Sequence, residues 1–220
     1  MKTIAVLLSG CGYLDGAEIT EAVLSYLALD RCGVNVKSFA PNEEQFHVVD
    51  HSSSTPVERQ TRNTLQEAAR ITRGQIQNLS ELNLEEFDGL VIPGGFGVAK
   101  NLCDFAFKGS AGVVQSLVKK TINDFHDSKK PIAGICIAPA LIAMSLDGKG
   151  SPQLTVGDDP ETMAEIEKTG ATLVSKQVDE ICVDEENLIA TTPAYMFDGA
   201  KRDKIFCGIE ACIKQVVDWA

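Results

Sequence analysis

A cysteine stands where a predicted strand meets a predicted helix. Residues 132–135 form a short apolar run, typical of a strand buried in a parallel sheet, and Cys136 follows directly. Pro139 fits the first turn of a helix, where its missing N–H does no harm. Such a nucleophile elbow holds a side chain over helix N–H groups and the positive end of the helix dipole. We therefore expect the thiol to ionise more readily than a free cysteine; the alternative is a buried core cysteine.

An acidic residue begins the first predicted helix. Asp15 fits its N-cap and Glu18 its third position, so Glu18 completes a capping box in the structural interpretation. The helix is predicted to run to Arg31 and to end at Gly33. Its apolar spacing predicts an inward face made of Ile19, Val23, Tyr26 and Leu27.

Two glycine-rich turns follow predicted strands. Residues 9–12 (Ser-Gly-Cys-Gly) end the first strand, and residues 93–97 (Pro-Gly-Gly-Phe-Gly) end the strand at 87–92. Glycines in the second turn let backbone N–H groups point into a site and donate to a developing oxyanion. The first turn lacks the spacing of a dinucleotide fingerprint. Cys11 in that turn either faces the same sheet edge as Cys136, as a second thiol, or simply lines the turn.

The three histidines give weak signals. His47 and His51 are four residues apart, a spacing that suits a metal on a helix, but Val48 and Val49 between them indicate a strand. His126 falls at the end of a predicted helix over residues 113–125, where we expect a structural role.

Strands and helices alternate along almost the whole chain. We predict strands over residues 3–8, 34–39, 87–92, 132–135, 154–156 and 172–174, a hairpin over 181–190, and helices over 58–71, 113–125, 160–168 and 199–219. This order predicts an α/β fold, a doubly wound, flavodoxin-like three-layer sandwich with a mainly parallel sheet. Residues 43–81 are interpreted as an insertion near the mouth of the sheet. Their arginines, from Arg59 to Arg73, line either an anion-binding edge or a solvated face.

Composition narrows the function classes. With 220 residues and 44% apolar content, the chain is expected to form one domain over residues 1–220. A net charge of −11 disfavours nucleic acid and anionic lipid as partners. No apolar run approaches the roughly 20 residues of a membrane span. Seven unpaired-looking cysteines and no visible signal or transit peptide predict a cytoplasmic location.

The order of motifs resembles the PfpI and class I glutamine amidotransferase-like superfamily over nearly the whole chain. Four blocks are similar to the ElbB family, whose members are described as isoprenoid-biosynthesis proteins with an amidotransferase-like domain and as glyoxalases. These blocks are residues 8–12 (Leu-Ser-Gly-Cys-Gly), 67–74 (Glu-Ala-Ala-Arg-Ile-Thr-Arg-Gly), 93–102 (Pro-Gly-Gly-Phe-Gly-Val-Ala-Lys-Asn-Leu) and 191–196 (Thr-Thr-Pro-Ala-Tyr-Met).

The resemblance implies roles for individual residues. Cys136 matches the elbow nucleophile, and Glu18 matches the acid that lies against the thiol and shares its proton. Gly95, next to Gly94, and Ile137 match the backbone donors of the oxyanion site. Peptidase relatives carry histidine where this chain has Ile137, and amidotransferase relatives use a late histidine, but none follows His126 here. Without that base, peptidase and glutaminase activities are disfavoured.

Two functional hypotheses follow. The first is a cofactor-independent glyoxalase that converts small 2-oxoaldehydes such as methylglyoxal to 2-hydroxy acids, with Cys136 as thiolate and Glu18 as acid and base. This internal redox reaction needs no nicotinamide, metal or glutathione. The alternative is a redox or carbonyl-stress sensor, associated with isoprenoid biosynthesis and acting through partners. In either case the resemblance implies a homodimer.

Overall fold

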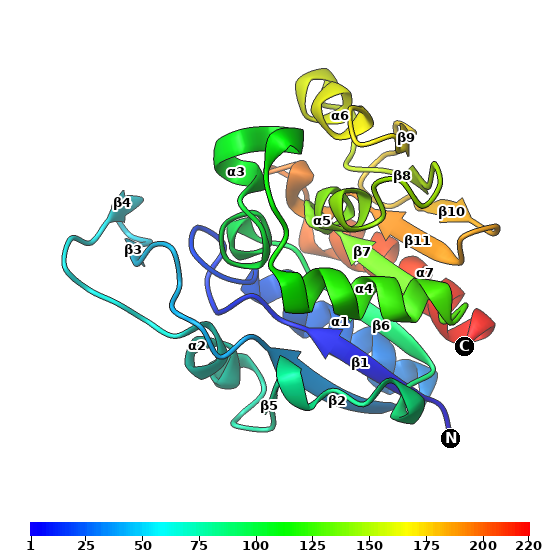
Figure 1. The fold of residues 1–220 in the computed structure, drawn as a ribbon, viewed down its shortest axis with the longest axis horizontal. Coiled ribbons are helices and arrows are strands. Elements are labelled where there is room, and N and C mark those ends of the chain that lie inside the picture. The colour runs from blue at the N-terminus through cyan, green and yellow to red at the C-terminus, as the bar shows by residue number, and fades with distance from the viewer.

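Seven strands form the central sheet of the computed structural model, which describes all residues from 1 to 220 (Figure 1). The strand order is β10-β11-β7-β6-β1-β2-β5, and only β10 runs antiparallel to its neighbour. The strands are β1 (Thr3–Leu7), β2 (Asn35–Ala40), β5 (Gln77–Asn78), β6 (Gly89–Ile92), β7 (Ile132–Ile135), β10 (Cys182–Asp184) and β11 (Ile189–Thr192). The predicted mainly parallel sheet is therefore confirmed.

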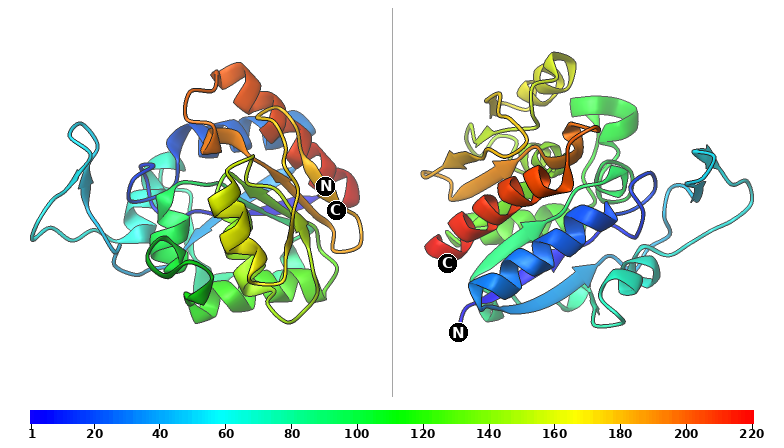
Figure 2. Two further views of the ribbon diagram at one scale, coloured as in Figure 1. Left: turned by 90° about the horizontal axis from the view of Figure 1, so that it is seen from above. Right: turned by 180° about the vertical axis from the view of Figure 1, so that it is seen from behind.

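Helices cover both faces of this sheet (Figure 2). Helices α1 (Ile19–Cys32), α2 (Thr64–Ile71) and α7 (Arg202–Trp219) share one hydrophobic core with the sheet. On the other face, α4 (Ser116–Asp127), α5 (Ala138–Ser145) and α6 (Pro160–Glu167) contribute to a second core. A short helix, α3 (Phe105–Lys108), precedes α4. The result is the expected three-layer sandwich.

Helix α1 begins later and is rotated relative to the prediction. Its N-cap is Glu18 rather than Asp15, whereas Gly33 ends it in a left-handed conformation as expected. Ile19, Val23 and Leu27 are exposed, whereas Tyr26, the fourth residue of the predicted face, is half-buried against the core. The buried positions of the helix are Glu21, Ala22, Ser25, Ala28 and Leu29. The small side chains on this face allow α1 to pack closely against α7. Hydrophobic spacing alone selected the wrong face because close helix packing favours small residues over large apolar ones.

The predicted insertion at residues 43–81 has two parts. Strands β3 (Val49–Asp50) and β4 (Thr55–Pro56) form a small hairpin that projects from the body of the molecule (Figure 1). Helix α2 and strand β5 then rejoin the main fold, because Ala68 is in the core and β5 pairs with β2. The expected helix start at Glu58 is wrong: α2 begins only after Asn63, whose side chain accepts the Gln66 N–H.

The segment between α5 and β11 adds two further strand pairs. Strands β8 (Gln153–Leu154) and β9 (Thr172–Leu173) pair in parallel outside the main sheet. Strands β10 and β11 form the predicted hairpin. None of the helices is both long and apolar enough to cross a bilayer.

Candidate active site

The elbow places Cys136 immediately after β7, with α5 beginning at Ala138. Cys136 has a φ of 61°, in the left-handed region that residues with a side chain rarely occupy. Its N–H donates to the Thr192 carbonyl (2.9 Å) at the end of β11, and Pro139 lies in the first turn of α5. The strained cysteine is therefore held between two central strands and a helix, as the nucleophile-elbow prediction requires.

Burial governs the chemistry of this thiol. The Cys136 residue is only 7% exposed. Burial, and then the nearby Glu21 carboxylate, raise the pKa of Cys136 well above its ordinary value, while the N–H groups of Gly95 and Ile137 pull this pKa downward. The expectation of a readily ionised thiol is therefore wrong for the resting site, because desolvation and a neighbouring carboxyl outweigh the helix end.

The carboxyl that borders the thiol belongs to Glu21, in the first turn of α1. Glu21 is completely buried, and its Oε1 accepts the Tyr195 N–H (3.0 Å). Its Oε2 has no hydrogen bond of normal geometry and lies against Gly94 and the Cys136 thiol. Burial, followed by the Glu18 charge, raises the pKa of Glu21 to about 8. The carboxyl is thus mostly protonated at neutral pH.

Glu18 occupies a different place from the one that the resemblance implied. Its Oε2 accepts the Glu21 N–H (2.6 Å), so the side chain caps α1. Burial raises the pKa of Glu18, while the Arg202 charge acts in the opposite direction. Glu18 therefore supports the start of the helix from which Glu21 reaches the thiol.

The role of Glu21 is not apparent from the apolar pattern of α1, because that pattern predicts the wrong helix face. With Ile19, Val23 and Leu27 directed inward, a glutamate at position 21 belongs on the solvent side. The run of small residues at Ala22, Ser25 and Ala28 is the sequence signal that identifies the true packing face, and it places residue 21 at that face's edge.

The second glycine turn fits tightly around the thiol and the carboxyl. A methyl group at Gly94 would lie 2.4 Å from the Cys136 Cβ and 2.5 Å from the Glu21 Oε2. Gly95 has a φ of 100°, and a methyl group there would lie 2.4 Å from the Glu18 N. The Glu18 N–H also donates to the Gly94 carbonyl (2.9 Å). Both glycines are needed for this close approach, and the Gly95 and Ile137 N–H groups act on the sulfur.

Cys11 lies in a different environment from Cys136. Burial and then the Glu67 charge raise the pKa of Cys11, and the charges of Arg70 and Arg62 oppose them. Glu67 itself is paired with Arg62 (3.4 Å) and Arg70 (3.0 Å). The structure thus associates Cys11 with the α2 charge cluster, and two of the predicted arginines serve as ion-pair partners in it.

The histidines lie away from the thiol. The His51 Nε2 accepts the Leu14 N–H (3.3 Å) and is 3.7 Å from the Asp15 Oδ1. Asp15 is buried, and its other oxygen accepts the Val49 N–H (2.7 Å). These contacts tie the β3 segment to the first glycine-rich turn. His126 is buried and contacts the Asn187 side chain (3.1 Å), which agrees with a structural role.

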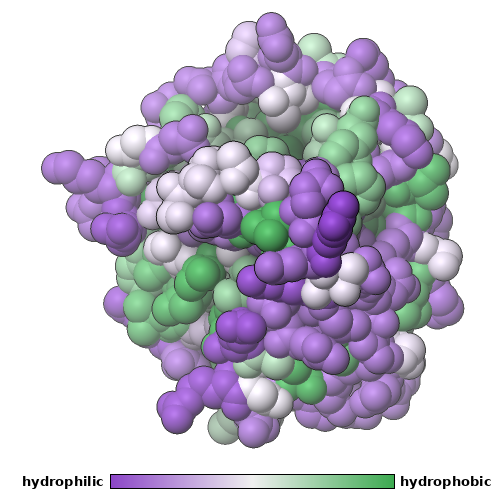
Figure 3. Space-filling view, turned by 90° about the vertical axis from the view of Figure 1, so that its left-hand side faces the viewer, coloured by the Kyte–Doolittle hydropathy of each residue, from purple (hydrophilic) through white to green (hydrophobic).

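Apolar side chains are exposed around the carboxyl ends of the parallel strands. Figure 3 shows this side of the molecule, with hydrophobic surface scattered among hydrophilic residues. The exposed Phe46 ring lies 4.3 Å from the Phe107 ring, measured between centroids, and His47 packs against both. Lys100 covers the exposed Phe96 ring at 5.0 Å.

Comparison with known proteins places the chain in a large family. Residues 6–200 match the family described as DJ-1/PfpI. The chain is 41% identical over 224 residues to the human "Glutamine amidotransferase-like class 1 domain-containing protein 3, mitochondrial", covering 98% of this chain and 82% of that protein. The same identity and 98% coverage of this chain hold for the rat "ES1 protein homolog, mitochondrial", of which 83% is covered.

Solved structures agree with this placement. An isoprenoid biosynthesis protein with an amidotransferase-like domain from Ehrlichia chaffeensis matches with a TM-score of 0.93 at 38% identity, covering 100% of this chain and 99% of that one. Drosophila melanogaster DJ-1beta matches with a TM-score of 0.53 at 20% identity, covering 99% and 96% of the two chains, and shows a shared fold. The predicted superfamily resemblance is confirmed, and the chain belongs to the DJ-1/PfpI family.

Proposed function

We propose that the protein is a cofactor-independent glyoxalase that converts small 2-oxoaldehydes to 2-hydroxy acids. The observation that carries the proposal is a strained elbow thiol beside a fully buried carboxyl of raised pKa. A carboxyl and a thiol that both hold protons at neutral pH can together release one proton and share the other. The singly protonated pair then provides a thiolate next to a carboxylic acid.

The first half of the reaction forms a covalent adduct. The Cys136 thiolate adds to the aldehyde carbon, and the N–H groups of Gly95 and Ile137 stabilise the oxyanion. The Glu21 carboxylic acid protonates this oxygen, which yields a hemithioacetal and leaves Glu21 as a carboxylate. An aldehyde is electrophilic enough for this step to proceed without a histidine base.

The second half is an internal redox reaction. The Glu21 carboxylate removes the proton from the former aldehyde carbon, and the electron pair forms an enediolate with the neighbouring carbonyl. Glu21 then returns this proton to the second carbon, while the hydroxyl proton on the first carbon passes to the second oxygen. The first carbon is thereby oxidised to a thioester and the second reduced to an alcohol. Water hydrolyses the thioester, releases the 2-hydroxy acid and regenerates the thiol, so the net co-reactant is one water molecule.

The geometry favours this enzyme over a redox sensor. A sensor needs an accessible thiol of low pKa, whereas Cys136 is nearly inaccessible and has a raised pKa. A buried pair suits a small substrate that displaces water as it binds.

Names of relatives include the word mitochondrial, so the cytoplasmic location stays a prediction.

The test is formation of lactate from methylglyoxal by the purified protein. Cys136→Ala and Glu21→Gln are each expected to lower kcat by at least about 100-fold, because each removes a group that acts in the transition state. Glu18→Gln, which keeps an oxygen for capping, is expected to cost less than about tenfold. Cys207→Ala is the thiol control, since Cys207 is exposed on α7. Turnover no faster than in a heat-treated sample contradicts the proposal.

A further inference from the structure

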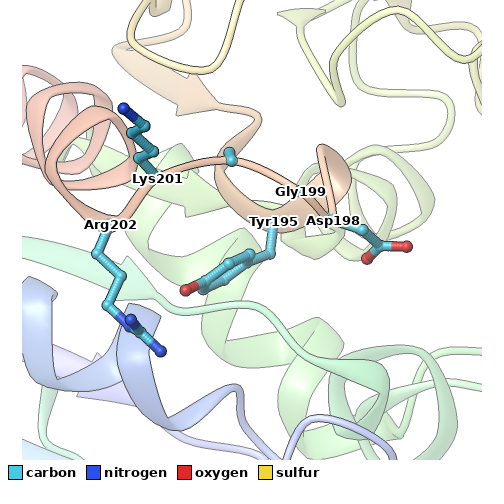
Figure 4. Close-up of a pocket in the computed structure, with 6 residues that line it drawn as sticks. Tyr195, Asp198, Gly199, Lys201 and Arg202 are labelled. Carbon is cyan, nitrogen blue, oxygen red and sulfur yellow. The ribbon is translucent and has the colours of Figure 1, made fainter.

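A cavity of about 450 Å³ lies beside the segment whose Tyr195 N–H binds the Glu21 carboxyl. Its lining consists of Tyr195, Asp198, Gly199, Ala200, Lys201 and Arg202, which connect β11 to α7 (Figure 4). One hydrogen bond links this cavity to the site, from the Tyr195 N–H to the Glu21 Oε1 (3.0 Å), and the Arg202 charge lowers the pKa of Glu18. The cavity wall and the hydrogen bonding of the Glu21 carboxyl therefore share one residue, Tyr195.

Two of the donor side chains that line this cavity lie on one side of it. In Figure 4 the Arg202 and Tyr195 side chains extend on the same side, toward the ribbon of the α1 region, whereas Lys201 and Asp198 point away. Arg202 forms no salt bridge in the fold, unlike Arg31, which pairs with Glu210, and Lys204, which pairs with Asp179. An unpaired guanidinium beside a phenol is a good binding group for an anion.

The charges nearby indicate which anion fits. The protein carries a net charge of −11, and the Glu18 charge lies close to Glu21, so an acidic substrate is repelled unless a cation compensates locally. Arg202 is the cation at that position. Asp198 at the opposite end of the cavity disfavours a doubly charged group such as phosphate relative to a single carboxylate.

We propose that Arg202 and the Tyr195 hydroxyl bind a carboxylate on the substrate, so that the enzyme prefers 2-oxoaldehydes with an acidic tail. This inference rests on the proposed function and specifies its substrate class. The probe is 4,5-dioxopentanoate, which the same reaction converts with one water molecule to 2-hydroxyglutarate. As with methylglyoxal, the aldehyde carbon is oxidised and the ketone carbon is reduced, without another oxidant.

The kinetic test compares this acid with uncharged methylglyoxal. Arg202→Gln is expected to raise the KM for 4,5-dioxopentanoate about tenfold more than the KM for methylglyoxal, and Tyr195→Phe severalfold more. Lys214→Gln is the matched control, because it removes one exposed positive charge from the same helix. Equal effects of Arg202→Gln on both substrates, or a wild type that does not prefer the acid, overturn the inference.

A binding experiment separates this inference from the proposed function. Titration calorimetry with 2-hydroxyglutarate requires no turnover, and we expect binding to wild type that is lost in Arg202→Gln and kept in Lys214→Gln. If neither aldehyde is consumed but this pattern is seen, the carboxylate site stands and the glyoxalase activity does not. If 2-hydroxyglutarate binds equally to all three proteins or to none, the carboxylate site is wrong even where methylglyoxal is turned over.

Discussion

Among single residues, Cys136 stands out because its backbone has a left-handed φ of 61° although it carries a side chain. A left-handed φ costs a residue with a Cβ about 1 kcal/mol or more relative to glycine. The hydrogen bond from Cys136 N to Thr192 and the tight contact with Gly94 hold the residue in place. These contacts thus offset the cost of the left-handed backbone, and they fix the direction in which the thiol points.

Backbone strain at position 136 can be measured with two variants that both lack sulfur. Cys136→Gly is expected to be more stable than Cys136→Ala by about 1 kcal/mol, because only glycine adopts this φ without cost. Urea unfolding of both variants at one pH supplies the comparison. A more stable alanine variant would show that the left-handed conformation carries no strain.

Protonation of Glu21 makes stability depend on pH. The ordinary pKa of this carboxyl is 4.5, and in the fold it rises to about 8. Between these values the folded chain binds more protons than the unfolded chain, so stability is greatest at low pH and falls as pH rises, by up to about 1.4 kcal/mol per unit. We expect Glu21→Gln to reduce this decline. Unfolding titrations at pH 5.5, 7 and 8.5 measure the difference, and parallel curves for the two proteins contradict the prediction.

Activity is expected to follow the opposite trend with pH. The proposed reaction needs the singly protonated pair, whose population increases when the first proton leaves near pH 8. The kcat/KM for methylglyoxal should therefore rise by roughly tenfold per unit well below this pH and then level off. A profile that is flat from pH 6 to pH 8.5 would exclude this proton from the mechanism.

At the scale of elements, the site depends on how closely α1, the turn after β6 and the elbow approach one another. Gly94 lies where all three meet, and it leaves no space for a side chain. Gly94→Ala is expected to lower the free energy of unfolding by more than about 2 kcal/mol, because the new methyl group overlaps Cys136 and Glu21.

Gly199→Ala is the control for that prediction. Gly199 has a negative or extended φ and open space around its Cα, so we expect a change below about 0.5 kcal/mol. Urea unfolding measures both variants. Similar stabilities for the two alanine variants would mean that the turn at Gly94 can relax.

The exposed face of α1 provides a prediction about assembly. Ile19, Val23 and Leu27 are spaced four residues apart and are 47%, 50% and 44% exposed. We propose that this apolar stripe forms the homodimer interface that the family resemblance implies. Light scattering should give about twice the chain mass of 23.6 kDa for wild type and for Val113→Glu, and a monomer for Val23→Glu. A wild-type monomer would contradict the proposal.

Sequence patterns predicted the elbow and the glycine turn that surround the site, but they did not predict which carboxyl lies beside the Cys136 thiol. The elbow at Cys136 and the turn at Gly94 and Gly95 depend on local constraints, namely a left-handed junction and close backbone approach, and such constraints are visible in residue type. The contact between Glu21 and Cys136 joins positions 115 residues apart and depends on the rotation of α1 about its axis. That rotation is set by packing against α7, and its only local trace is the run of small residues at Ala22, Ser25 and Ala28, which large apolar neighbours obscure.

At the scale of the whole molecule, the parallel sheet determines where chemistry can occur. Strand alternation predicted the doubly wound fold because each buried strand needs helices on both faces. It could not predict that β10 and β5 form the edges, since these strands are short and lie beside segments whose pairing depends on distant contacts. The residues around Val49 indicated the strand that became β3, but not that the β3–β4 hairpin projects, because Asp15 and His51 attach it through interactions far apart in sequence.

Residues 1 and 220 lie together at the end of the molecule where β1 starts and α7 finishes, opposite the carboxyl ends of the parallel strands (Figure 1). A fluorophore, an affinity handle or a surface tether attached at either residue would therefore lie at the end of the sheet opposite the one where Cys136 follows β7. Immobilised protein should accordingly take up reagents and substrates at the rates of the free protein.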